Sequence, residues 1–353
     1  MKDSYTVTAI SSNKERLETF GKAQGVDTFH IELTRKITPI EDLKAVFKLY
    51  KFLKKEKPSI VHTHTPKAGI VGMLASYLAR APNRLHTVAG LPLLESTGGK
   101  RKVLNFVEKL TYICATKVYP NSFGLKKIIK ENNFSTENKL KVIANGSSNG
   151  IDTSYFNPDL FTNKKKEILK DKLKIKKEDF VYIFVGRIVG DKGINELIAA
   201  FDQLSKERND VKLLLVGPFE AELDPLKEKT KTLIKTNKKI ISVGYQNDVR
   251  PYFAIANALA FPSYREGFPN VVMQAGAMGL PSIVSNINGC NEIIEEHKNG
   301  IIIPVKNSEA IYKAMLKMML DKNMKKNARK MITSRFEQKV VWEALLNEYK
   351  IFH

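Results

Sequence analysis

Cysteine is scarce in this sequence, and long apolar runs are absent. Of 353 residues, only Cys114 and Cys290 are cysteines. Two cysteines so far apart exclude a disulfide framework and a cysteine-rich zinc cluster. The first twenty residues are too polar for a signal peptide, and no later apolar run reaches the length that spans a bilayer. We therefore expect a protein of the reducing cytoplasm.

Acidic residues are outnumbered by basic ones. The chain has 58 Lys and Arg residues against 37 Asp and Glu residues, a formal net charge of +21. Its 43% of hydrophobic residues exclude an acidic disordered chain and suffice for the cores of two domains. The lysines cluster at residues 51–57, 126–130, 164–166 and 325–330. Such clusters indicate either an ordinary solvated surface or attraction to an anionic inner-membrane surface, on whose cytoplasmic face we expect the protein to be peripheral.

Short apolar runs alternate with amphipathic stretches along the whole chain, which is typical of an α/β fold. In the first half, strands are predicted at residues 6–10, 28–31, 60–64, 84–88, 117–119 and 141–143, and helices at 40–55, 68–81 and 102–115. In the second half, the runs VYIFVGR, KLLLVG, IISVG, ALAFPS, PSIVS and GIIIP predict six buried strands of a parallel sheet. The pattern predicts two doubly wound, Rossmann-like domains facing a central cleft.

A segment rich in Gly, Ser and Asn separates the two series of strands. It reads ANGSSNGIDTSYFNPD, residues 144–159, and we interpret it as an interdomain linker. The predicted domains are therefore residues 1–150 and residues 151–335. Apolar residues recur at helical spacing in the tail FEQKVVWEALLNEYKIFH, so residues 336–353 are expected to form a helix that packs back on the N-terminal domain.

The segment VYIFVGRIVGDKG places two cations after a buried strand. Gly186 permits a sharp turn there, Arg187 emerges at the carboxyl end of the strand, and Lys192 precedes a helix that starts near residue 194. Two cations and a helix N-terminus at one spot favour a diphosphate. A βα turn with two solvated cations is the alternative that the spacing leaves open.

The segment FPSYREGFPNVVMQAGAMG places a carboxylate before a buried helix. Glu266 and Gly267 lie in a predicted loop, Pro269 suits a first helical turn, and Gln274 lies about two turns further on, near the same face. A carboxylate here can accept hydrogen bonds from ligand hydroxyls. Ordinary capping of the helix by Glu266 is the alternative.

Together with HTHTPKAG, GSSNGID, VGYQNDVRPYFAIANALAFPSYREGFPN and NGCNEIIEEHKNGIIIPVKN, these two segments closely resemble the retaining glycosyltransferase family 4, of GT-B fold. The resemblance covers nearly the whole chain and is best to bacterial enzymes that build capsule, O-antigen or lipid-linked oligosaccharides. It implies an acceptor-side N-terminal domain and a C-terminal domain that binds a nucleotide-sugar.

The resemblance implies roles for particular residues. Arg187 and Lys192 would bind the diphosphate of the donor and stabilise the charge that develops as it departs. Glu266, the first residue of the Glu-x7-Glu motif of the family, would contact hydroxyls of the donor sugar. Further substrate-binding positions are Gly186, Gly267, Phe268, Pro269, Asn270, Gln274 and His64. No cofactor and no divalent metal are implied, because side chains supply the cations.

The chain departs from the family pattern at three places. The second Glu of the motif is Gln274, whose amide offers one acceptor and one donor to the ribose instead of a carboxylate. Ala89 stands where many members have a His. At the N-terminus, about one βα unit of the first domain is expected to be absent.

Two further kinds of site find little support. His62 and His64 share one face of a predicted strand, but no carboxylate or thiol partner for a metal is evident, so a structural or cleft-lining role is favoured. The net charge would suit a nucleic acid, yet no recognition motif is present. We therefore predict transfer of a hexose or N-acetylhexosamine from a nucleotide-sugar, with a UDP-sugar favoured, to a glycan or polyprenyl-linked acceptor. A catalytically weak GT-B protein acting as a binding subunit is the alternative.

Overall fold

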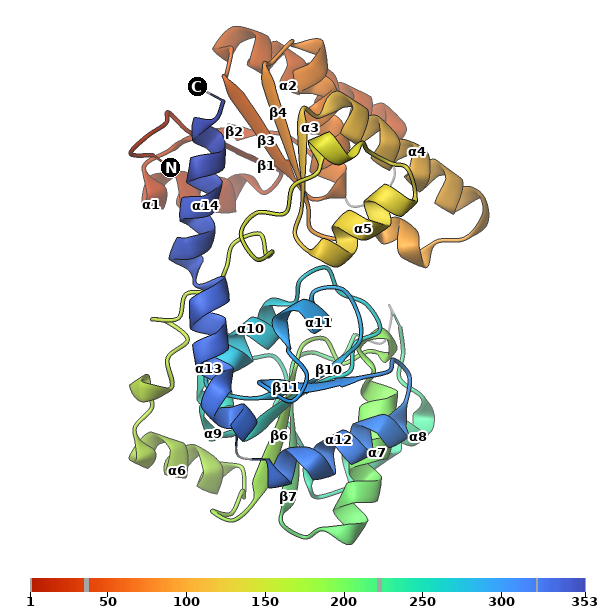
Figure 1. Cartoon of the computed structure of the whole chain (residues 1–353), viewed down its shortest axis with the longest axis vertical. Coiled ribbons are helices and arrows are strands. Elements are labelled where there is room, and N and C mark those ends of the chain that lie inside the picture. Colours follow the sequence, from red (N-terminus) through yellow and green to blue (C-terminus); the bar gives the residue numbers. More distant parts are fainter. Residues whose placement is uncertain (1, 35–37, 221–223, 322, 353) are drawn as a thin grey trace. The chain divides into compact units, whose positions relative to one another are not determined.

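The computed structural model describes residues 2–34, 38–220, 224–321 and 323–352. Its internal contacts divide the chain into two compact units (Figure 1). Unit 1 comprises Met1–Ser148 and Trp342–His353, and unit 2 comprises Asn149–Val341. The sequence predicts these divisions after residues 150 and 335. No helix in the described ranges is both long enough and apolar enough to cross a membrane.

Unit 2 is built around a six-stranded parallel sheet. The strand order is β11-β10-β9-β6-β7-β8, which is the doubly wound order. All six apolar runs predicted as strands are strands, and most of their residues are buried, except at the edge strand β8, where Ser242 is exposed. Their bounds are β6 Phe180–Val185, β7 Val211–Val216, β8 Ile240–Ser242, β9 Ala258–Phe261, β10 Ser282–Ser285 and β11 Gly300–Ile303.

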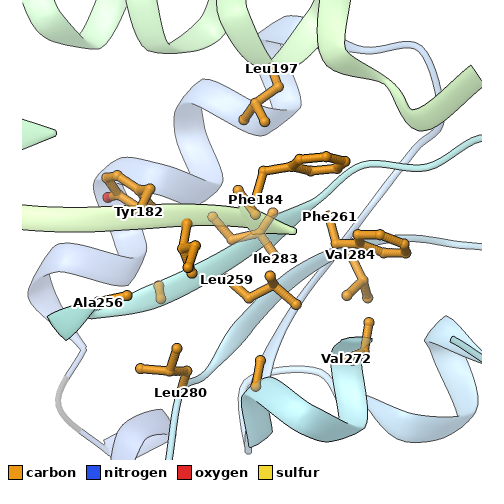
Figure 2. Close-up of a cluster of buried hydrophobic side chains, with 14 of the residues drawn as sticks. Tyr182, Phe184, Leu197, Ala256, Leu259, Phe261, Val272, Leu280, Ile283 and Val284 are labelled. Atoms are coloured by element: carbon orange, nitrogen blue, oxygen red, sulfur yellow. The ribbon is translucent and has the colours of Figure 1, made fainter. Parts of the chain in front are cut away.

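Helices cover the sheet of unit 2. Their bounds are α6 Asn163–Lys172, α7 Ile194–Glu207, α8 Glu228–Thr236, α9 Arg250–Ile255, α10 Asn270–Ala277, α11 Cys290–Ile293, α12 Ser308–Leu320 and α13 Asn323–Phe336. Figure 2 shows Leu197 of α7 on one side of the strands and Val272 of α10 on the other, with Phe184, Leu259 and Ile283 of the strands between them. All five side chains are fully buried, so this core fixes the strand ends that carry the predicted site.

In its described residues, unit 1 has five strands, also parallel, which form two separate sheets. One contains β1 (Thr8–Ser11) and β2 (Asp27–His30), and the other has the order β3-β4-β5, with β3 Ile60–His64, β4 Asn83–Val88 and β5 Lys117–Pro120. The sixth predicted strand, residues 141–143, is wrong. That segment makes a backbone hydrogen bond from Lys141 to Val118, next to an isolated bridge at Leu140, and does not extend the ladder.

The two sheets of unit 1 are separate ladders. In the described residues, β1 pairs with β2 and β3 pairs with β4, and no strand pairing joins the two sheets. Next to β1 and β2 lies a cavity of about 700 Å³, lined by residues between Lys2 and Thr28.

The helices of unit 1 are α1 Lys14–Gln24, α2 Pro39–Glu56, α3 Pro66–Leu78, α4 Gly98–Cys114, α5 Phe123–Glu131 and α14 Gln338–Lys350, the last of which begins in unit 2. Gly69 and Gly72 let α3 approach the strands, because a Cβ at either position would lie within 2.5 Å of His86 or Thr63. Figure 1 shows α14 in dark blue. Ala344, Leu345 and Tyr349 of α14 pack with the cluster of Leu85, Tyr119 and Ile143.

The C-terminal tail forms the predicted helix as α14, although the helix begins at Gln338 and not at residue 336. Phe336 ends α13 and is completely buried in the core of unit 2, where its ring meets that of Phe268. Glu337 then forms an isolated parallel bridge with Ile151, and α14 starts at Gln338. Phe336 fits the helical spacing of the apolar residues that follow it, which is why the sequence predicts a start two residues too early.

Candidate active site

The predicted site residues of unit 2 lie at the carboxyl ends of its central strands. The chain proceeds from β6 to β7 and β8 on one side, and then returns to place β9 on the other side of β6. Ligands of open α/β sheets bind at such a topological switch point. The loop after β6 carries Arg187 and Lys192, and the loop after β9 carries Glu266.

Two glycines set the geometry after β6. Gly186 has a φ of +151°, and Gly217, at the corresponding end of β7, has a φ of +147°. A Cβ at Gly217 would lie 1.8 Å from the carbonyl oxygen of Gly186, so the backbone requires glycine there. The chain then places the half-exposed guanidinium of Arg187 with its Nη1 3.3 Å from Glu220 Oε2.

Lys192 ends a 3₁₀ turn, Gly190–Lys192, that leads into α7. Gly193 follows with a φ of +71°, and a Cβ on it would lie 2.1 Å from the carbonyl oxygen of Pro262. This close approach holds the start of α7 against the chain that leaves β9. It brings Lys192 and Glu266, 74 positions apart, within reach of each other.

Lys192 and Glu266 form an ion pair. Lys192 Nζ donates to Glu266 Oε1 at 2.5 Å, and the two side chains are only 15% and 18% exposed. The structure thus brings together two of the three predicted catalytic residues. Glu266 does not cap α10, because no side-chain capping bond is present at that helix start. The capping alternative is therefore wrong.

The loop after Glu266 is fixed by packing. Gly267 approaches the next loop so closely that a Cβ on Gly289 would lie 2.5 Å from its carbonyl oxygen. Phe268 and Pro269 are buried, and Asn270 is exposed. Pro269 is the residue before α10, which begins at Asn270, so the expectation that it lies in the first turn is off by one residue. Glu266 precedes the helix, and helical spacing does not relate it to residue 274.

Two helix N-termini open at this edge of the sheet. Neither α7 nor α10 has a side-chain cap, so their first amides lack side-chain acceptors. Together with Arg187 and Lys192 they form an anion-binding environment. Gln274, one turn into α10, is half-buried, and its side chain makes no hydrogen bond within the described ranges.

Sequence reasoning missed the acidic residues that support this site. Asp224 Oδ2 accepts from the backbone amide of Asp191 at 2.6 Å, and its carboxyl group packs on Gly190. Arg265 Nη2 lies 2.7 Å from Asp191 Oδ2. Glu220, opposite Arg187, was also missed. These carboxylates lie 33 or more positions from their partners, and no local spacing signals such contacts.

Cys290 lies beneath the ion pair and is completely buried. Burial raises the pKa of its thiol well above the usual value, and the Glu266 carboxylate raises it further. The thiol is therefore neutral and unreactive.

The histidines of the first half lie in unit 1. The rings of His62 and His64 stack at 4.4 Å, so the two share one face of β3. Both ring nitrogens of His62 contact hydroxyl groups, Nδ1 that of Tyr349 at 2.5 Å and Nε2 that of Thr87 at 2.7 Å. Within the part of the chain that the structure describes, no group of three potential ligands could hold a metal ion. The substrate-binding role of His64, which is exposed, stays a prediction.

Comparison with known proteins identifies the class. Residues 165–334 match the family model "Glycosyl transferases group 1", and residues 1–123 match "Glycosyl transferase 4-like". The capsular polysaccharide biosynthesis glycosyltransferase CapM of Staphylococcus aureus is 34% identical over 326 residues, which cover 91% of this chain and 84% of CapM. The chain therefore belongs to the family 4 glycosyltransferases and is a glycosyltransferase.

A second relative has a more detailed description. The UDP-Gal:alpha-D-GlcNAc-diphosphoundecaprenol alpha-1,3-galactosyltransferase of Escherichia coli is 35% identical over 318 residues, covering 86% of this chain and 78% of that enzyme. Among solved structures, Anabaena Alr3699/HepE in complex with UDP and glucose superimposes with a TM-score of 0.81 at 19% identity, covering 97% of this chain and 91% of that one. The likeness confirms the predicted GT-B fold of two Rossmann-like domains.

Proposed function

We propose that this glycosyltransferase retains the anomeric configuration and transfers a hexose or an N-acetylhexosamine from a UDP-sugar to a lipid-linked glycan intermediate of a cell-envelope polysaccharide. The observation that carries the proposal is the arrangement in unit 2. Arg187, Lys192 and the open N-termini of α7 and α10 gather around the switch point between β6 and β9. A nucleotide diphosphate supplies the negative charges that this environment favours.

The relatives support the donor and the acceptor class. The Escherichia coli relative is named for a UDP-galactose donor and a diphosphoundecaprenol-linked acceptor, and the Staphylococcus aureus relative for capsular polysaccharide biosynthesis. Both relatives are transferases by name, and neither favours the alternative of a degenerate binding subunit. Transfer to a lipid-linked acceptor also accords with a peripheral position at the cytoplasmic face of an anionic membrane.

The residues support a front-face mechanism. The acceptor hydroxyl approaches the anomeric carbon on the side from which the diphosphate departs, and a phosphate oxygen takes the hydroxyl proton. Arg187 and Lys192 stabilise the charge on the departing diphosphate. Glu266 accepts hydrogen bonds from hydroxyls of the donor sugar and holds Lys192 in position through their 2.5 Å contact. We further propose that no divalent metal is needed, because these two cations face the diphosphate themselves.

Transfer assays test the proposal directly. The full chain is incubated with a panel of UDP-hexoses and UDP-N-acetylhexosamines and a diphospholipid-linked GlcNAc acceptor, with and without EDTA. We expect UDP release and an α-linked product that depend on the acceptor and persist in EDTA. Replacing Arg187 and Lys192 by Ala should abolish transfer, whereas Lys206→Ala, an exposed control on α7, should not. Full activity in the Arg187/Lys192 double variant would refute the assignment of this site.

A further inference from the structure

The outer faces of two neighbouring helices in unit 1 carry large apolar side chains in solvent. On α2, Ile40, Leu43 and Phe47 are 72%, 66% and 56% exposed. They recur at i, i+3 and i+7, which places them on one face of the helix. A stripe at this spacing normally packs into a core, yet the core-facing residues of α2 are a different set, Ala45, Val46, Leu49 and Leu53.

Helix α4 repeats this arrangement. Val103, Phe106 and Ile113 are 49%, 66% and 65% exposed and share one helix face, since they are separated by three and seven positions. Its opposite face, including Tyr112, is buried in the core. By contrast, each helix from α6 to α13 in the described part of unit 2 exposes at most one large apolar side chain. Single exposed apolar residues need no explanation, but two parallel stripes do.

The two helices lie in one layer. Helices α3 and α4 are successive crossovers between neighbouring parallel strands, so the right-handed rule puts both on the same face of the sheet. Helix α2 packs against α3 through the cluster that contains Val46, Leu49 and Val71. Figure 1 shows α3 between α2 and α4. We use the name basic apolar face for the surface formed by the exposed lysines of α2 and α4 and six apolar side chains, Ile40, Leu43, Phe47, Val103, Phe106 and Ile113.

Exposed lysines outnumber exposed acidic residues beside the apolar side chains on both helices, and on α2 the exposed Glu41 is paired with Lys44. On α4, Lys102 and Lys109 are exposed and lie within one turn of Phe106, and the sole acidic residue of that helix, Glu108, is buried. On α2, Lys51 lies with its Nζ 4.5 Å from the centre of the Phe47 ring, and Lys48, Lys54 and Lys55 are also exposed. Apolar side chains at the centre with lysines at the rim match an anionic bilayer, whose acyl region takes the former and whose headgroups attract the latter.

We propose that the basic apolar face of α2 and α4 is the surface by which this enzyme docks on an anionic phospholipid bilayer. The inference rests on the proposed lipid-linked acceptor, and it deepens that proposal by naming the residues that meet the membrane. A second copy of the chain is a poorer occupant, because two lysine-rich faces repel each other. The docking uses no residue of the donor site, which lies in unit 2.

Vesicle co-sedimentation tests the proposal. The full chain is mixed with vesicles of phosphatidylglycerol and phosphatidylcholine, or of phosphatidylcholine alone. We expect binding to the anionic vesicles at least tenfold tighter than to the neutral ones. Phe106→Ser combined with Ile113→Ser, and separately Lys102→Gln combined with Lys109→Gln, should each weaken anionic binding about tenfold or more. Ile168→Ser is the matched control, since Ile168 is 60% exposed on α6 of unit 2 and should leave binding unchanged.

Three further measurements keep the outcomes distinct. Circular dichroism of each variant checks that it is folded. UDP binding by the vesicle-free protein tests the donor site, which the serine variants should leave intact. Sedimentation velocity without vesicles detects self-association through this face. Three results would overturn the proposal: wild-type binding in both α4 double variants, equal binding to neutral vesicles, or a dimer that is lost when Phe106→Ser is combined with Ile113→Ser. Anionic binding without any transfer activity would leave the docking face standing and refute the proposed function.

Discussion

Lys192 and Glu266 stand on opposite sides of the switch point of unit 2 and contact each other at 2.5 Å. The charges of the two side chains compensate each other, and both side chains are about four-fifths buried. A donor that brings a diphosphate adds negative charge beside Lys192, and Glu266 then has sugar hydroxyls as further partners. The pair is thus ready for the donor before it binds, and no side chain must be moved from bulk water.

The ion pair predicts non-additive effects. Lys192→Ala should lower kcat of transfer by about 10²-fold or more, because a cation that stabilises the leaving group is lost. It also leaves the Glu266 carboxylate without its partner, which repels the diphosphate. The double variant Lys192→Ala with Glu266→Gln should therefore recover part of the UDP affinity but none of the kcat. Calorimetric titration with UDP and steady-state transfer rates separate the two effects. Additive losses in UDP affinity would contradict this electrostatic account.

Replacing Gln274 by Glu should change the affinity for the donor. Gln274→Glu restores the carboxylate of the family motif at a half-buried position without a side-chain hydrogen bond within the described ranges. If this residue faces the ribose, the variant should lower KM for the UDP-sugar about threefold to tenfold while kcat changes little, since a charged acceptor binds ribose hydroxyls more strongly. Gln203→Glu, on the exposed side of α7, is the control. An unchanged KM would place residue 274 away from the ribose.

Replacing Gly217 by any other residue should cause a large loss of stability. Its φ of +147° disfavours any other residue, and a Cβ would meet the carbonyl oxygen of Gly186 at 1.8 Å. Because both partners are backbone, neither can move aside, and Gly217→Ala should cost about 3 kcal/mol or more in the free energy of unfolding of unit 2. Gly279→Ala has open space around it and a φ of +80°, so about 1 kcal/mol is expected. Urea unfolding followed by circular dichroism compares the two, and equal losses would contradict the steric argument.

The buried His86 should make the stability of unit 1 sensitive to acid. Burial, together with the nearby His64, lowers the pKa of His86 to about 3. The unfolded chain therefore binds a proton below about pH 6.5 that the folded chain refuses. This contribution to stability is complete above pH 6.5 and falls by about 1.4 kcal/mol per pH unit down to about pH 3. His86→Gln should flatten the dependence of unfolding free energy on pH between 7 and 5, whereas the exposed His297→Gln should not. An unaltered slope in His86→Gln would be evidence against this account.

Arg329 belongs to the lysine-rich cluster of the sequence but has a structural role. The sequence suggests a basic surface at residues 325–330. The structure instead directs the Arg329 guanidinium to the carbonyl oxygens of Phe156 at 2.8 Å, Thr153 at 3.0 Å and Ala277. Arg329→Lys offers one nitrogen in place of the two that contact these carbonyl oxygens, so we expect a loss of about 2 kcal/mol in the stability of unit 2 by thermal unfolding. Lys330→Gln, next to it and exposed, should change stability little.

The sequence predicts best where one local pattern settles the structure. The six strands of unit 2 are recognisable because each is apolar on both faces and bounded by Gly or Pro. The tail is harder, because Phe336 fits a helical pattern on either side of the break. Its burial against Phe268 in unit 2 decides where α13 ends, and that contact spans 68 positions.

The residues of the candidate site also differ in how well the sequence predicts them. Arg187 and Lys192 are predictable, since each lies in the turn between a strand and a helix whose ends the sequence marks. The residues that contact Arg187 and Lys192 are not equally predictable. Glu266 is predictable through the family motif, whereas Glu220 meets Arg187 only because Gly186 and Gly217 bring the ends of β6 and β7 together.

The divided sheet of unit 1 bears on how that unit opens. In the described part of the chain, β1 pairs only with β2 and β3 only with β4, so no backbone hydrogen bonds join the two sheets. Side-chain packing around Ile31 and Val46 joins them instead. We therefore expect the segment from β1 to β2 to open separately, so that its amides exchange with deuterium well before those of β4 and β5 while the rest of the molecule stays folded.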